Sequence, residues 1–324
     1  MKVKILLKMV FMFASLSAPE RLLLKAYAKT DVNQTVSAFD KLKQAAEKED
    51  WRQLQQLIKG FLCQESSRQG TELFLFWAVE NKKPKLIDLL LEQGVKPIAH
   101  DEEDTSVLML AARQGDLKLV QKLIQKGAGL QAQNQWGHSV LASAVFSGDL
   151  EVVNYLIHQG LDPKAESDAG FILLMAAIYA NEAELFDYLL TFGLDPKQIN
   201  ASGQSLLMYA AEQGAFTMCS TLLGIGIDPD LQNYQGSTAL MKAAYNGHLD
   251  VLQLLLDKGA EINARKQDGS TALIWATRQE HIDIVNVLLK KGARRNFKDS
   301  SGKSALDYAR TTGNIELIKL LSST

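Results

Sequence analysis

A period of 33 residues runs through this chain and constrains its fold more than any other feature. Each repeated leucine is followed three residues later by alanine, and twelve residues after that alanine a leucine returns. Fixed self-similarity of this kind indicates a tandem-repeat protein, in which each unit buries its apolar face only by stacking on its neighbours. The repeated leucines are Leu42, Leu75, Leu108, Leu141, Leu174, Leu207, Leu240, Leu273 and Leu306, and the alanines run from Ala45 to Ala309.

The pattern within one unit predicts two short helices and a polar turn. In residues 236–260, Thr238 is a predicted N-cap, since its hydroxyl can accept from an amide that has no partner in the first turn. Gly247 is expected to end this helix in the left-handed conformation. A second helix is predicted from about 248 to 257, because its leucines share one face, and Gly259 closes it. The polar stretch that leads to the next unit suits a β-hairpin or an extended loop.

These units resemble the ankyrin repeat, which has the same period. The G-x-T/S-x-L-x-x-A motif carries the resemblance in GSTALMKA at 236–243, GSTALIWA at 269–276 and GQSLLMYA at 203–210. The stretch GHLDVLQLLLDKGAEINA at 247–264 is also similar to the family. The resemblance covers residues 68–324 and implies an all-α solenoid of stacked helix-turn-helix units, with β-hairpin or loop connections. We expect seven full units and a truncated C-terminal unit.

Residues 29–67 are predicted to form an N-terminal helical cap with an irregular loop. Ser37 with Asp40 resembles a capping box that opens the first helix of the cap. Trp51 begins an apolar stripe that predicts the second helix. The sequence FLCQESSRQG at 61–70 is expected to be irregular and to replace the usual hairpin.

The first 28 residues differ from the rest and favour an exported bacterial protein. Two lysines precede an apolar run from Ile5 to Ala18, and Ala26-Tyr27-Ala28 fits the small-x-small rule for signal peptidase. We therefore expect cleavage after Ala28 and a periplasmic or secreted protein. An uncleaved anchor, a transit peptide or a disordered start stay open, and the last of these would leave the protein in the cytoplasm. The apolar run is short of the roughly 20 residues that span a bilayer.

The overall charge disfavours binding to nucleic acid. The formal net charge is −2, and cleavage would remove five basic residues and one acid, which makes the charge more negative. Whole-chain attraction to phosphate is therefore not expected. A basic cluster is interpreted as a solvated face: Lys290, Lys291, Arg294, Arg295 and Lys298.

No catalytic, cofactor-binding or metal-binding site is predicted. The chain has two cysteines and five histidines, and none of them has metal-ligand spacing. Cys219 aligns with core positions, whereas Cys63 lies in the expected loop, so a redox-sensitive protein is a minor alternative, as is an enzyme or metal-binding site within residues 29–70. His248 and His281 share one repeat position and are interpreted as capping and packing residues. The acidic run from His100 to Asp104 is interpreted as a solvated turn tip.

The resemblance implies that turn tips and exposed first-helix residues form a concave binding face. Aromatic side chains there are hard to explain as core, and such rings are enriched among interface hot spots. Packing of these rings on neighbouring turns is the open alternative. The candidate partner-binding residues are Trp136, His138, Phe146, Phe171, Tyr179, Tyr234, Tyr245, Arg265 and Arg278. Acids, Glu102 and Glu103, lie at one end of the series, and Lys298 and Lys303 at the other.

Together these features predict a monomeric, non-enzymatic scaffold that binds another protein through an ankyrin solenoid. No cofactor, no nucleic acid, and no membrane association beyond the N-terminal segment are expected. A secreted effector that docks and redirects a host protein is the alternative, since it would use the same face on a partner outside the producing cell.

Overall fold

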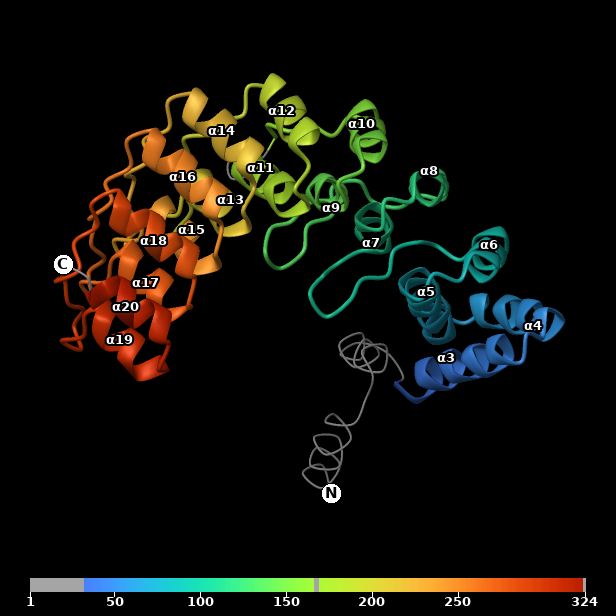
Figure 1. Cartoon of the computed structure of the whole chain (residues 1–324). Helices are drawn as coiled ribbons and strands as arrows, with labels where there is room; N and C mark the ends of the chain where they lie inside the picture. The colour runs from blue at the N-terminus through green and yellow to red at the C-terminus, as the bar shows by residue number, and fades with distance from the viewer. Residues whose placement is uncertain (1–31, 166–168, 323–324) are drawn as a thin grey trace. The chain divides into compact units, whose positions relative to one another are not determined.

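The structure is a computed structural model that describes residues 32–165 and 169–322 (Figure 1). Within this part, every regular element is a helix, and the turns add only isolated β-bridges such as Gln133 with Ser139. The predicted signal segment 1–28 lies outside the described residues. The chain divides into two compact units, Met1–Asp162 and Pro163–Thr324, which we describe separately.

The first unit is built from helix pairs stacked side by side. Helices α3, α5, α7 and α9 contact one another in succession and form a first row, and each packs against the second helix of its own pair. The bounds are α3 Val32–Glu47, α4 Trp51–Leu62, α5 Glu65–Glu80, α6 Pro84–Glu92, α7 Val107–Arg113, α8 Leu117–Gln125, α9 Val140–Ser147 and α10 Leu150–His158.

The second unit repeats the arrangement with five helix pairs. The odd-numbered helices α11 to α19 contact in succession, and so do the even-numbered helices α12 to α20. The bounds are α11 Ala169–Ala180, α12 Ala183–Thr191, α13 Leu206–Gln213, α14 Phe216–Gly224, α15 Ala239–Asn246, α16 Leu249–Asp257, α17 Ala272–Arg278, α18 Ile282–Lys290, α19 Ala305–Thr312 and α20 Ile315–Ser322. The predicted all-α repeat solenoid is thus confirmed.

The repeated leucines and alanines form the core of each unit. Leu141, Ala144 and Leu156 are all at most 3% exposed, and the equivalent Leu240, Ala243 and Leu255 at most 1%. Alanine adds little bulk, so first-row helices approach closely, whereas the leucines supply most of the buried apolar area.

Hydroxyl caps begin several first-row helices in each unit, as predicted for Thr238, whereas α5 follows Gln64 without a side-chain cap. The Thr238 side chain accepts from the amide of Met241, and Gly247 ends the helix at a φ of +83°. A reciprocal capping box is present at Ser304 with Asp307, where both cap hydrogen bonds form. The other helices with a hydroxyl cap of this kind begin after Ser106, Ser139, Ser205 and Thr271.

Of the predicted capping and packing roles of His248 and His281, the packing is confirmed, whereas side-chain capping is wrong although both residues stand at N-cap positions. Each residue precedes a second-row helix, but neither side chain makes a cap hydrogen bond. The imidazole Nε2 of His248 lies 3.0 Å from the Glu212 carbonyl, and that of His281 lies 3.1 Å from the Tyr245 carbonyl. A carbonyl can only accept, so Nε2 carries the proton, and each ring joins its own repeat to the preceding repeat within the second unit.

Two expectations for the N-terminal cap are also wrong. Helix α3 begins at Val32, so Ser37 lies inside a helix and cannot open it with Asp40. Residues 61–70 are not an irregular loop, because α4 continues to Leu62 and α5 begins at Glu65. Burial of Phe74 and Leu75, both 0% exposed, outweighs the weak helix propensity of the glycine and serines in α5. The second helix predicted from Trp51 is confirmed as α4.

Successive turn tips are joined by single backbone hydrogen bonds rather than by full hairpins. The amide of Gln135 donates to the carbonyl of Glu103 at 2.9 Å, and the amide of Tyr234 donates to that of Ser202 at 3.1 Å. The same bond joins Gln267 to Gln235 and Ser300 to Asp268. These bonds hold the tips at a fixed spacing within each unit.

Candidate partner-binding surface

Three positions of each repeat place side chains on the same surface of the first-row helices. These positions lie three residues before the repeated leucine, two residues after it and five residues after it. We call the surface that their side chains form the first-helix face. In the unit around Leu141 these positions are His138, Ser143 and Phe146. The two later positions share a face because residues three apart are neighbours on a helix.

In the first unit, the first-helix face holds a hollow of about 420 Å³. Trp136 stands at its rim and is 53% exposed. The ring of His138 lies between those of Trp136 and Phe146, with centroids 6.3 and 5.4 Å away. The hollow brings together three of the predicted residues, and its full lining is Glu103, Thr105, Met109, Arg113, Asn134, Trp136, His138, Ser143 and Phe146.

The small size of Ser143 leaves room for this hollow. Its side chain is buried, and its hydroxyl donates to the Ser139 carbonyl at 3.0 Å. Met109 contributes another wall and is fully buried. The sequence analysis did not predict Ser143 and Arg113 as lining residues. Ser143 lies away from the repeat glycines, whereas Arg113 stands two residues before Gly115, as Phe146 stands before Gly148, and this shared repeat position could have revealed it.

The turn that carries Trp136 is fixed by its own side chains. The Asn134 side-chain oxygen accepts from the amide of Trp136 at 3.1 Å and from that of His138 at 2.9 Å. Gly137 follows at a φ of +76°, which glycine adopts at little cost. With the backbone bond from Gln135 to Glu103, these contacts place the indole without help from a ligand.

The hollow holds a histidine with a shifted pKa. Burial lowers the pKa of His138 below its ordinary value of 6.5, and the positive charge of Arg113 lowers it further. His138 is therefore neutral at pH 7, and its ring adds polarity to the hollow without adding charge.

A second hollow, of about 480 Å³, lies in the N-terminal cap. Trp51 and Trp77 line it together with Pro84. Trp51 is 39% exposed. The sequence analysis used it only to predict helix α4 and did not name it as a candidate surface residue.

In the second unit, the predicted aromatic residues divide into exposed and buried ones. Tyr179, Tyr234 and Tyr245 are exposed. Phe171 is only 7% exposed, so the prediction that its ring lies on the surface is wrong. Its ring packs edge-on against Tyr209, with centroids 6.0 Å apart, and that contact removes it from solvent.

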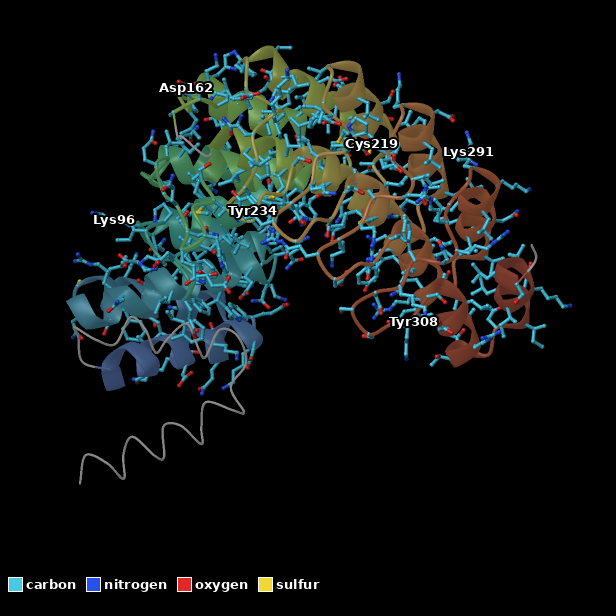
Figure 2. All side chains as sticks on the ribbon, turned by 90° about the vertical axis from the view of Figure 1, so that its left-hand side faces the viewer. Lys96, Asp162, Cys219, Tyr234, Lys291 and Tyr308 are labelled. Carbon is cyan, nitrogen blue, oxygen red and sulfur yellow. The ribbon has the colours of Figure 1, made fainter. Side chains whose placement is uncertain are left out.

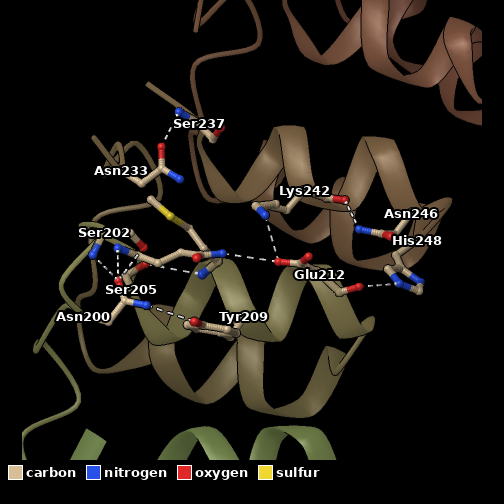
Figure 3. Close-up of polar contacts among 12 residues, drawn as sticks. Asn200, Ser202, Ser205, Tyr209, Glu212, Asn233, Ser237, Lys242, Asn246 and His248 are labelled. Atoms are coloured by element: carbon tan, nitrogen blue, oxygen red, sulfur yellow. Dashed lines mark hydrogen bonds and ion pairs between the residues drawn. The ribbon is translucent and has the colours of Figure 1, made fainter. Parts of the chain in front are cut away.

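Polar side chains join α13 to α15 (Figure 3). The Lys242 ammonium lies 2.9 Å from the Glu212 carboxylate, which also accepts from the Gln204 side chain at 3.3 Å. The Asn200 amide donates to the Tyr209 hydroxyl at 3.0 Å. Glu212 is thus committed to contacts within the unit and is not a free acid on the surface.

Farther along the second unit, cations lie over aromatic rings. The Arg278 guanidinium lies 4.8 Å from the Trp275 ring centroid and 5.1 Å from that of Tyr308. Lys266 lies 5.1 Å from Trp275, and Lys303 lies 5.4 Å from Tyr308. We call Trp275, Arg278, Tyr308, Lys266 and Lys303 the aromatic–cation ladder, and Figure 2 labels Tyr308 within it.

Of the ladder, the sequence analysis named Arg278 as a candidate contact residue and Lys303 as a cation at one end of the series, but it did not name Lys266, Trp275 or Tyr308. Trp275 lies three residues before Arg278 on one helix, and that spacing is the signal that could have revealed it. Tyr308 occupies the same repeat position as Trp275, 33 residues later.

Two other predicted contact residues also act within the fold. Arg265 donates to the carbonyls of Gly269 and Lys298, at 3.3 and 3.1 Å, so it ties neighbouring turns together. Tyr234 is 64% exposed, yet its ring lies against Gly203, where an added Cβ would come within 2.8 Å of it. Packing on neighbouring turns and exposure to a partner are therefore compatible.

The remaining candidate chemistry gives no site in the described residues. Burial raises the pKa of the Cys219 thiol to about 12, so this thiol is not activated, and Cys63 is exposed. Across residues 32–165 and 169–322, no group of three His, Cys, Asp or Glu side chains is placed to hold a metal ion. Over the same residues, no helix has both the length and the apolar character needed to cross a bilayer.

Comparison with known proteins identifies the repeat. A family model described as ankyrin repeats in three copies matches the chain at residues 75–167, 173–266 and 260–324. Both the hollow and the aromatic–cation ladder lie in the matched region. Among curated proteins, none matches the sequence.

Proposed function

This chain belongs to the ankyrin-repeat family, and on that premise we propose that it binds a partner protein non-covalently through its first-helix face. Ankyrin repeats are generally protein–protein interaction modules. We propose that the protein is a binding scaffold and not an enzyme, and that a side chain of the partner enters the hollow beside Trp136.

The preformed hollow is the observation that carries this proposal. A concave, partly apolar site with a few polar groups is what a partner's anchor side chain requires. The wall combines Trp136 and Phe146 with the neutral His138, and the turn holds them in place through Asn134. Because the site exists before binding, little ordering of the protein opposes association.

Site-specific photo-crosslinking in the native host tests this proposal. We would replace Trp136 with benzoylphenylalanine and use the same replacement of Trp51 as the matched control. Both are exposed tryptophans of the first unit that line separate hollows. A discrete crosslinked protein from position 136 and none from position 51 is the expected result. Equal crosslinking from both positions, or none from position 136, would refute the proposal that the partner binds at the hollow beside Trp136.

We further propose that the partner is met outside the cytoplasm, because of the signal-like sequence at 1–28. Intact mass measured on separate cell fractions tests this. A species that begins at Lys29 in the envelope or the medium is expected, whereas a full-length cytosolic species would exclude export. If the producing cell secretes the protein to a host, the same face would act as an effector surface.

A further inference from the structure

We propose that the aromatic–cation ladder of the second unit binds an acidic segment of a protein partner, through carboxylates that pair with Arg278 and Lys303. This inference rests on the proposed function, because it names the chemistry of a partner segment on the same first-helix face. It concerns residues separate from the hollow beside Trp136.

The rings fix the cations of the ladder in place. Arg278 lies against Trp275 on its own helix and against Tyr308 of the next repeat, at 4.8 and 5.1 Å. A guanidinium stacked on rings keeps its edge N–H groups free to take a carboxylate in bidentate fashion. The rings also restrict the long side chain, so less conformational entropy is lost when a carboxylate binds.

Arg278 and Lys303 form no ion pair with a carboxylate of the described residues. Among the described residues, no Asp or Glu oxygen lies within 4.0 Å of the charged nitrogens of Arg278 or Lys303, whereas Lys266 pairs with Asp268 at 3.7 Å. Arg278 is exposed, so an incoming carboxylate can reach it without displacing an internal ion pair.

The carboxylate nearest to the ladder is committed to its own turn. One oxygen of Asp299 accepts from the amides of Ser301 and Lys303, and the other accepts from the Tyr308 hydroxyl. Desolvation opposes ionisation of Asp299, but these hydrogen bonds and the charge of Arg278 hold its pKa below the ordinary value. Asp299 thus orients Tyr308, and although its charge interacts with that of Arg278, no ion pair within 4.0 Å joins these two described residues.

Lys266 replaces a residue type that stabilises the other turns. At the equivalent position, Asn134 and Asn233 each accept from two backbone amides of the turn, and so do Asp101, Asn200 and Asp299. A lysine cannot accept, and Asp268 supplies only one substitute bond, from the amide of Ser270 at 2.9 Å. The turn loses a local hydrogen bond here and gains a cation over Trp275.

Charge complementarity therefore favours an acidic segment with interspersed apolar side chains. The carboxylates would meet Arg278 and Lys303, and the apolar side chains would meet the flanks of Trp275 and Tyr245, whose rings pack at 5.0 Å. Single-stranded nucleic acid also binds surfaces that combine aromatic rings with cations. The chain's net charge of −2 disfavours that ligand.

Fluorescence anisotropy with defined probes tests this inference on the full chain. The first probe is a labelled peptide of about twelve residues in which Glu alternates with Leu or Tyr, and the second has every Glu replaced by Gln. We expect the acidic peptide to bind about tenfold tighter or more, because charge-assisted bidentate hydrogen bonds are the stronger ones. A thymidine oligonucleotide serves as the third probe.

Paired substitutions locate the binding. Arg278→Gln with Lys303→Gln should weaken binding of the acidic peptide about tenfold, to the level of the Gln peptide. Lys290→Gln with Lys291→Gln removes the same charge from exposed positions in and after α18, and should leave the affinity nearly unchanged. This control separates a local site from a change in net charge.

Several outcomes would overturn the inference. They are equal affinity for the two peptides, no binding of either, the same loss in both double variants, or tighter binding of the oligonucleotide. None of them affects the proposed function, which is judged by crosslinking of the native partner at position 136. If crosslinking at position 136 fails but the acidic peptide binds specifically at Arg278 and Lys303, the partner surface would instead lie at the ladder alone.

Discussion

The first-helix faces of the two units use the same repeat positions but present different surfaces. Ser143 and Trp275 are equivalent residues four repeats apart, and so are Phe146 and Arg278. In the first unit, the small Ser143 and the neighbouring Arg113 line a hollow. In the second unit, Trp275 is equivalent to Ser143 and Tyr245 is equivalent to Arg113. Their rings pack against each other with centroids 5.0 Å apart, at the positions whose equivalents line the hollow in the first unit.

This difference separates what builds the solenoid from what it presents. Leucines, alanines, hydroxyl caps and left-handed glycines recur in both units, because stacking requires them. Side chains on the first-helix face lie outside this recurring core, and the contacts that they make between neighbouring repeats differ from one unit to the other. The first unit presents a hollow with aromatic walls for an apolar anchor, and the second presents cations for an acidic segment.

The largest expected effect tests whether the two units share one scaffold. Leu156→Ala and Leu255→Ala change equivalent residues that are both 0% exposed. Each should lower the free energy of unfolding by about 2–5 kcal/mol, through lost transfer free energy and a residual cavity. Urea denaturation followed by circular dichroism measures the loss. A small loss at either site would mean that the repeat register is wrong there.

A smaller effect should differ between the units at one equivalent glycine. Gly115 and Gly247 both have positive φ, at +70° and +83°. An added Cβ at Gly115 would meet Asp149 at an ordinary 3.5 Å, whereas at Gly247 it would lie 2.7 Å from the imidazole of His281. Gly115→Ala should therefore cost about 1 kcal/mol from backbone strain alone.

Gly247→Ala should cost about 2–3 kcal/mol, because it also displaces His281 and breaks its bond to the Tyr245 carbonyl. Equal costs for the two glycine variants in thermal or urea unfolding would show that the histidine contact adds nothing to stacking. A larger cost at Gly115 would reverse the comparison.

The smallest effect concerns the pH dependence of the hollow. The folded-state pKa of His138 lies below 6.5, so below that pH the unfolded chain binds more protons at this residue. Stability should therefore fall as the pH decreases from 6.5 through the folded-state pKa. His138→Gln should reduce this dependence, as measured by urea midpoints at pH 7 and at about pH 5. An NMR titration that places His138 at or above 6.5 would contradict the assigned burial of its ring.

Sequence periodicity predicted the scaffold well because each repeated residue type meets a local requirement, such as capping a helix or adopting a positive φ. Thr238 caps a helix, and the residue at the position of Gly247 has a positive φ in other repeats as well, even where it is Asn181 or Glu280. The N-terminal cap lacks such repetition, and there tertiary burial of Phe74 made helix α5 from a segment with weak local preference.

The surface was predicted less well, because exposure depends on neighbours in the next repeat. The sequence predicted that the Phe171 ring is exposed, but the ring packs against Tyr209 of the next repeat. The hollow beside Trp136 depends on the small Ser143, and no motif marks an empty volume. Trp275 was within reach of sequence reasoning, since its spacing from Arg278 places both on one face.

The affinity of the native partner for a hollow-deficient variant tests the central claim most directly. Trp136→Ala with Phe146→Ala should weaken binding by about 2 kcal/mol or more, which is roughly thirtyfold in Kd. The melting temperature should change little, because Trp136 is exposed and Phe146 is not part of the stacked core. Trp51→Ala, the matched control, should bind normally. An unchanged Kd for the double variant would contradict partner binding at this face.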